Sequence, residues 1–218
     1  MVTFDIISIF PDSLSPYVKS SILGRAIKKK LIKVNLVNLR DFASGKHRIV
    51  DDAPYGGGPG MVLKADVIFR AVKKSLGRKK RKTRVILFST RGKKFDAKMA
   101  RKFSAYEKLV LISGRYEGVD ERVAKFCADE EISIGDYVLS GGELPSLVFL
   151  EAVSRQIPGV LGKEESLEEK KGSYPVYTRP SSFTVLLGGK KKKFDVPGVL
   201  LHGNHKEIDE WRKTQGRL

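Results

Sequence analysis

The chain has 218 residues, of which 41% are hydrophobic, so it can bury one sizeable core with a small appendage but not two full domains. Its 42 lysine and arginine residues exceed its 25 aspartate and glutamate residues, and the net charge of +17 attracts polyanions, nucleic acid foremost. No segment approaches the roughly 18 apolar residues of a membrane span, and the N-terminus lacks the pattern of a signal peptide. We therefore expect a cytoplasmic protein with no membrane partner.

Apolar segments of strand length alternate with segments of helical period along the chain. The predicted strands cover residues 2–10, 33–39, 84–89 and 108–113, with one more short strand at the start of SIGDYVLSGGELP, residues 133–145. The predicted helices cover residues 15–30, 64–76, 96–106, 119–128 and 144–157. This alternation predicts an α/β fold with a largely parallel sheet and helices on both faces.

The composition turns polar after residue 161. We expect a first domain over residues 1–161, a linker over 162–175 and a small, mainly helical C-terminal domain over 176–218, with a helix that begins after Asn204. Cys127 is the only cysteine, which excludes an internal disulfide, and its setting in RVAKFCADE predicts the buried face of a helix.

Three glycine-rich turns follow predicted elements: PYGGGPGM (54–61), ISGRYEGVDER (112–122) and SIGDYVLSGGELP. The glycine pair Gly141 and Gly142 leaves backbone amides open to close approach by a bound molecule. Because loops at the ends of successive elements form the usual ligand site of an α/β fold, the three turns together predict a binding pocket.

Familiar chemical motifs are mostly missing from the sequence. There is no GxxxxGK[ST] phosphate loop and no GxSxG serine motif, and His202 and His205 stand without cysteines or a third ligand, so no metal site is predicted. The basic runs at residues 78–84 and 190–193 are either solvated loops or phosphate contacts.

The ordered set of motifs resembles the bacterial tRNA (guanine-N1)-methyltransferases, which belong to the trefoil-knotted SPOUT methyltransferases. The similar segments cover most of the chain: residues 40–61, 111–122, 133–145, 157–166, 177–180 and 199–212. The resemblance implies a homodimer with its active site at the subunit interface, a C-terminal trefoil knot in the first domain, and a C-terminal domain that binds tRNA. It also implies S-adenosylmethionine as cofactor and methylation at N1 of guanosine 37, immediately 3′ of the anticodon.

The resemblance assigns roles to particular residues. Arg155 matches the arginine that contacts the guanine oxygen, and His47, Arg48, Asp51 and Gly60 match a loop that faces tRNA. The residues matching the cofactor site are Leu87, Ser89, Gly114, Tyr116, Glu117, Ile134, Gly135, Asp136, Tyr137, Val138, Leu139, Gly141, Gly142 and Pro145.

Guanine N1 carries a proton, so methylation needs a base, and the negative charge that develops on O6 needs a cation or an amide beside it. Where the family has an aspartate thought to act as this base, Lys170 stands in a shortened segment. Glu169 or, second, Glu168 takes the role, or the base is absent. Thr90 and Arg91 also depart from the family's usual proline and glutamine.

The sequence therefore predicts an adenosylmethionine-dependent tRNA methyltransferase. A catalytically impaired tRNA-binding paralogue is the alternative, and a nucleotide hydrolase using the glycine loops is a third class. Whether magnesium assists the reaction is left open.

Overall fold

The computed structural model describes residues 1–77, 82–162 and 174–215. The chain divides into two compact units, Met1–Gly162 and Lys163–Leu218.

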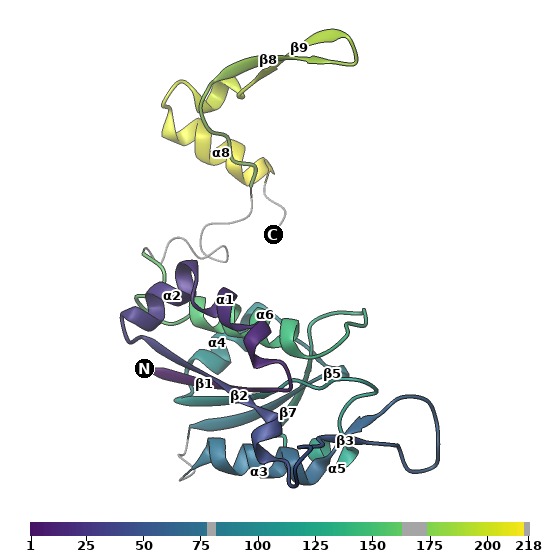
Figure 1. Ribbon diagram of the computed structural model, residues 1–218. Coiled ribbons are helices and arrows are strands. Elements are labelled where there is room, and N and C mark those ends of the chain that lie inside the picture. Colours follow the sequence, from purple (N-terminus) through teal and green to yellow (C-terminus); the bar gives the residue numbers. More distant parts are fainter. Residues whose placement is uncertain (78–81, 163–173, 216–218) are drawn as a thin grey trace. The chain divides into compact units, whose positions relative to one another are not determined.

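A parallel sheet of five strands organises the larger unit (Figure 1). Its strands are β1 (Val2–Ser8), β2 (Ile32–Asn38), β5 (Thr83–Lys94), β6 (Lys108–Ile112) and β7 (Glu130–Ser133), in the order β2-β1-β6-β5-β7. All four pairings are parallel. Strands of this kind are buried on both faces, which is why they appear in the sequence as nearly continuous apolar runs. The predicted α/β fold with a largely parallel sheet is confirmed.

Helices cover both faces of this sheet (Figure 1). They are α1 (Ser15–Val18), α2 (Ser21–Lys28), α4 (Ala97–Ser104) and α6 (Glu143–Arg155) on one face, and α3 (Ala65–Leu76) and α5 (Glu121–Phe126) on the other. The first face packs around the aromatic rings of Phe88, Phe103 and Phe149, and the second around aliphatic side chains such as Ile68 and Val123. Each face thus has its own apolar core, joined through the sheet.

The single helix predicted over residues 15–30 is wrong, because the chain breaks between α1 and α2. Ser20 is extended and Ser21 has a φ of +45°, so the helical path stops and restarts. The carbonyl oxygen of Lys19 lies 2.2 Å from where a Cβ on Gly24 would stand, a contact that only glycine permits. The lack of a side chain at Gly24 lets the two short helices lie this close.

Several predicted boundaries also shift. The strand placed at the start of residues 133–145 lies before them, as β7. Helix α5 begins only at Glu121, because the Asp120 side chain accepts a hydrogen bond from the Arg122 amide and caps it. Cys127 follows the helix, half-buried, instead of lying on its buried face. Burial raises the pKa of Cys127 to about 11, so the thiol stays protonated and unreactive at neutral pH.

The glycine-rich residues 54–61 join a short antiparallel pair, β3 (Asp51–Asp52) and β4 (Val62–Leu63). The short 3-10 helices η1 (Pro11–Ser13) and η2 (Leu39–Phe42) follow β1 and β2.

The smaller unit holds an antiparallel hairpin of β8 (Ser182–Leu187) and β9 (Lys190–Asp195), the 3-10 helix η4 (Gly198–Leu200) and helix α8 (His205–Gln215). The prediction of a mainly helical piece missed this hairpin. The four lysines at residues 190–193 resemble a solvated loop, yet in β9 they pair with β8, three of them opposite apolar residues and Lys193 opposite Thr184. The helix predicted after Asn204 is present as α8.

Candidate functional site

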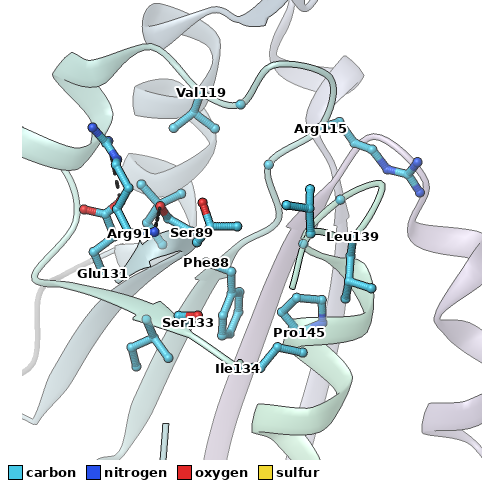
Figure 2. A pocket seen from close by; sticks show the side chains of 18 of the residues that line it. Phe88, Ser89, Arg91, Arg115, Val119, Glu131, Ser133, Ile134, Leu139 and Pro145 are labelled. Atoms are coloured by element: carbon cyan, nitrogen blue, oxygen red, sulfur yellow. Dashed lines mark hydrogen bonds and ion pairs between the residues drawn. The ribbon is translucent and has the colours of Figure 1, made fainter. Parts of the chain in front are cut away.

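A cavity of about 540 Å³ lies where β5, β6 and β7 reach their carboxyl ends, the usual position of a ligand site in a parallel sheet. Its volume falls in the range that holds a cofactor-sized molecule. The lining residues are Leu87, Phe88, Ser89, Thr90, Arg91, Gly114, Arg115, Tyr116, Glu117, Gly118, Val119, Glu121, Glu131, Ile132, Ser133, Ile134, Gly135, Tyr137, Val138, Leu139, Ser140, Gly141, Gly142 and Pro145. In Figure 2, Phe88, Ile134 and Pro145 gather on one side of the cavity, and Arg91 and Glu131 lie on the other.

Two loops meet along one wall of this cavity, and glycine allows them to touch. Gly141 forms an antiparallel bridge with Arg115, and the Gly142 amide donates to the Gly114 carbonyl at 2.8 Å. A Cβ on Gly142 would lie 2.6 Å from the Cα of Ser113. The glycine pair therefore brings two backbones into direct contact, and both loops present main chain to the cavity.

The buried carboxylate of Glu143 also connects the same two loops. Glu143, only 4% exposed, accepts from the Ser8 hydroxyl at 2.6 Å and from Arg115 Nε at 3.0 Å. The Arg115 guanidinium also lies over the Phe10 ring, 4.9 Å from its centroid, and points away from the cavity (Figure 2). Because a buried charge needs its partners, this ion pair holds the first turn of α6 against the loop after β6.

An arginine and two glutamates form the polar side of the cavity. Arg91 donates to Glu121 at 2.7 Å and lies 3.6 Å from Glu131 Oε1. The bond from Arg91 holds the pKa of Glu121 below its ordinary value, so Glu121 is a carboxylate at neutral pH. The Oε1 atom of Glu131 is buried and accepts no hydrogen bond from the part of the chain that the structure describes. It remains free to accept a hydrogen bond from a ligand that enters the cavity.

A register shift in β5 brings Thr90 and Arg91 to the cavity. Pairing with β7 stops at Phe88 and resumes at Lys93, and a Cβ on Gly92 would lie 2.5 Å from the Ile132 backbone. The intervening residues bulge out of the ladder, as strands often do beside functional sites.

Of the fourteen residues that the resemblance assigns to the cofactor, thirteen line the cavity. Asp136 does not: it is exposed and forms an ion pair with Lys94 outside the cavity. Sequence reasoning missed Arg115, Glu131 and Glu143 as parts of the site. Glu143 stands between a glycine pair and an apolar helix, and a lone acid in that position is the signal that could have found it.

The glycine-rich loop of residues 54–61 lies beside the same cavity. The Glu117 amide donates to the Met61 carbonyl at 3.1 Å, and a Cβ on Gly60 would lie 2.5 Å from the Glu117 carboxylate. Asp51 lies at the start of this loop in β3, whereas His47 and Arg48 are exposed in the preceding turn, where Arg48 pairs with Asp41 at 3.1 Å. Of the residues expected to face tRNA, Gly60 thus lies against Glu117, which lines the cavity.

Arg155 lies elsewhere, at the last residue of α6. It lines a second, mostly apolar groove of about 440 Å³ with Tyr17, Leu144, Leu147, Val148, Glu151 and Ala152. Glu168 and Glu169 lie outside the described residues. Of the three expected catalytic residues, the structure therefore places Arg155 alone.

Among residues 1–77, 82–162 and 174–215, no three histidine, cysteine, aspartate or glutamate side chains cluster as a metal site, and we assign magnesium no step. In the same ranges, no helix has the length and apolar character needed to span a bilayer.

The model of the family tRNA (Guanine-1)-methyltransferase TrmD matches residues 2–218 of the chain. The chain belongs to this family. A protein of Carboxydothermus hydrogenoformans named tRNA (guanine-N(1)-)-methyltransferase is 47% identical over 98% of the chain and 82% of its own length. Proteins of the same name are 48% identical in Sulfurihydrogenibium sp. (96% of the chain, 81% of the relative) and 44% identical in Clostridioides difficile (97% and 91%). Membership of the tRNA (Guanine-1)-methyltransferase family covers both units of the chain.

Proposed function

We propose that the protein transfers a methyl group from S-adenosylmethionine to N1 of guanosine 37 in tRNA. The observation that carries this proposal is the cavity at the carboxyl ends of β5, β6 and β7, in a chain that belongs to the tRNA (Guanine-1)-methyltransferase family over nearly its whole length. The substrate suggests a cytoplasmic location, where tRNA is modified.

The cavity suits adenosylmethionine in size and in its donor set. Leu87, Leu139 and Pro145 offer apolar contacts to an adenine ring, and the backbone around Gly141 offers amides and carbonyls. Glu131 Oε1, which accepts no hydrogen bond from the described residues, would accept one from a hydroxyl or an amine of the ligand. When bound, the cofactor supplies an activated methyl group on its sulfonium. The role of the protein is to hold that methyl group in line with the attacking N1 of guanine.

The chain must also remove the N1 proton and stabilise the charge on O6. We propose Glu169 as the proton acceptor and Arg155 as the partner of O6, with Glu168 as the second choice for the base. The support is the resemblance and the place of Glu169, one residue before the aligned aspartate position. A glutamate is one methylene longer than an aspartate and can make up part of that distance.

The position of Arg155 supports a homodimer with its active site at the subunit interface. Arg155 lies ten positions after Pro145, which lines the cavity, and this is about 15 Å along α6, farther than an arginine side chain extends. Leu144 and Val148, which line the same groove as Arg155, are 59% and 46% exposed, and a second copy of the chain would cover this apolar area. We infer that the partner subunit's Arg155 completes each cavity.

We further propose the trefoil knot for the first domain, taken as residues 1–161. Its support is the family membership and the close contact of the two loops at Arg115 and Gly141. Residues 162–175 would then link to a tRNA-binding domain over 176–218, a division that the two compact units support.

Incubation with unmodified tRNA and methyl-labelled adenosylmethionine tests the whole proposal. We expect one labelled base, N1-methylguanosine at position 37, and the same assay with chelator or added magnesium measures the metal dependence. Label at another base, or none, would overturn the proposal, and tRNA binding without transfer would identify an impaired paralogue instead.

The substitution Glu169→Gln tests the base, because glutamine keeps the shape and removes the basicity. We expect single-turnover methyl transfer to fall on the order of 100- to 10,000-fold with unchanged cofactor affinity. Glu168→Gln is the matched control and should transfer at a near-normal rate. Near-normal transfer by the Glu169 variant would shift the assignment to Glu168, and near-normal transfer by both variants and their double would exclude both.

A further inference from the structure

The β8–β9 hairpin sorts its side chains onto two different faces. Directly opposite residues in an antiparallel pair share a face, and the register pairs Phe183 with Phe194, Val185 with Lys192 and Leu187 with Lys190. The other face carries Ser182, Thr184, Leu186, Lys191, Lys193 and Asp195. One face thus combines two aromatic rings, two aliphatic side chains and two lysines. We call it the aromatic face.

The apolar side chains of the aromatic face are about half exposed. Phe183 is 51% exposed and Phe194 is 41% exposed, and their rings stack with centroids 5.4 Å apart. Exposed aromatic rings on an isolated hairpin are costly in water, so a partner that covers them gains apolar contact. Figure 1 shows the hairpin, marked with the labels β8 and β9.

Charge decides what kind of partner fits. The hairpin holds four lysines and one aspartate, a net charge of +3, and the aspartate lies on the other face, 2.9 Å from Lys193. Lys190 and Lys192 form no ion pair with any residue that the structure describes. A face with stacked aromatic rings and unpaired lysines matches the surfaces that bind unpaired nucleotides, where rings stack on bases and cations contact phosphates.

We propose that the aromatic face of the β8–β9 hairpin binds unpaired bases of the tRNA substrate. A base continues the stack on the exposed side of Phe183 or Phe194, and Lys190 and Lys192 contact the phosphates that flank it. The inference rests on the proposed function, since it takes tRNA as the polyanion. It adds a contact that the cavity and its glycine-rich loop do not make.

The two pairs of lysines on β9 provide a matched comparison. Lys190→Gln/Lys192→Gln and Lys191→Gln/Lys193→Gln each remove two positive charges from the same strand, on opposite faces. Binding to unmodified tRNA is measured for the full chain by fluorescence anisotropy over a range of salt concentrations. For the first variant we expect weaker binding and a log-log salt slope shallower by about 1.4, because about 0.7 is lost for each single-strand phosphate contact. The second variant should change the slope by less than half as much.

Phe183→Leu/Phe194→Leu removes the stacking rings and keeps apolar side chains in the strands. We expect the Kd for tRNA to rise at least about 5-fold, the lower end of the effect of losing one base stack, with adenosylmethionine binding unchanged. If this variant does not fold, as judged by thermal melting, the lysine pairs still decide the question.

Tight tRNA binding by all three variants, or equal effects of the two lysine pairs, would overturn the inference. An altered sedimentation mass for the phenylalanine variant with an unchanged Kd would also overturn it, since the face would then lie between copies of the chain. Failure of the wild-type chain to bind tRNA would instead reject the proposed function, and with it the hairpin's partner.

Discussion

Two of the glycine-rich loops of the larger unit, residues 54–61 and 133–145, share a composition but differ in their surroundings. In the loop over residues 54–61, nothing lies within 4 Å of a Cβ placed on Gly56 or Gly57, and Tyr55 is fully exposed. In the loop that ends at Gly142, the same construction meets the backbone of Ser113. Gly56 and Gly57, with φ values of +87° and +79°, thus serve the conformation of the first loop, whereas Gly142 serves close contact in the second.

The ion pair beside each loop differs in the same way. Glu143 and Arg115 pair at 3.0 Å with the carboxylate almost fully buried, whereas Lys64 and Asp52 pair at 3.2 Å in solvent. A buried charge depends on its partner, and an exposed pair contributes little. The comparison suggests that the loop ending at Gly142 is a preformed wall of the cofactor cavity, and that the loop over residues 54–61 can adapt to the substrate.

The largest expected effect comes from Glu143→Gln, which leaves the Arg115 guanidinium without its anion. Loss of one partner of a buried pair costs about 3 kcal/mol, which lowers Tm by roughly 6–12 °C in a chain of this size. Thermal melting measures the loss, and adenosylmethionine should raise the variant's Tm less than it raises that of the wild type. A Tm within 2 °C of the wild type would contradict the role given to this pair.

Gly142→Ala should have the second-largest effect, because its new methyl group would clash with the Ser113 backbone. Overpacking of this kind costs about 1–3 kcal/mol and would push the two loops apart. We expect reduced stability together with weaker adenosylmethionine binding by calorimetric titration. Unchanged affinity would show that the contact is not needed for the cavity.

Gly57→Ala is the matched comparison for Gly142→Ala, because nothing lies within 4 Å of a Cβ at position 57. Its φ of +79° makes alanine unfavourable by about 1 kcal/mol, with no clash to add. Adenosylmethionine affinity should stay at the wild-type value while tRNA affinity falls. If Gly57→Ala weakens cofactor binding as much as Gly142→Ala does, the contrast between the loops is wrong.

The smallest effect is expected from Lys64→Gln, which removes the exposed pair. The hydrogen bond from Lys64 lowers the pKa of Asp52, so the pair contributes at neutral pH and above, and its contribution is lost as pH falls through the folded pKa of Asp52. The Tm difference between variant and wild type should be small at neutral pH and vanish in acid. A difference that grew as the pH fell would contradict this sign.

Much of the larger unit could be predicted from the sequence, because buried parallel strands leave apolar runs such as LVLI, the last four residues of β6. The glycine-rich turns likewise indicated where backbone would surround a ligand. Contacts between distant side chains left no local signal: Ser8 and Glu143 are 135 residues apart, and only the fold brings them together. The same holds for the β5 bulge that carries Arg91 to the cavity.

The hairpin escaped prediction for a different reason. Four consecutive lysines have low strand propensity and no apolar alternation, so the period of two is visible only on the partner strand. The break at Ser21 is similarly hidden, because it depends on how close Lys19 comes to Gly24.

Helix α6 has its first turn in the cavity wall, and one side of the helix from Leu144 to Arg155 lines the apolar groove. If the groove is where subunits associate, the same helix connects ligand occupancy to assembly. Thermodynamic reciprocity then applies. If the methyl donor raises the association constant of the subunits by some factor, association must raise the affinity for the donor by the same factor. Titrations at different protein concentrations would therefore yield different apparent affinities, and their ratio would measure the coupling.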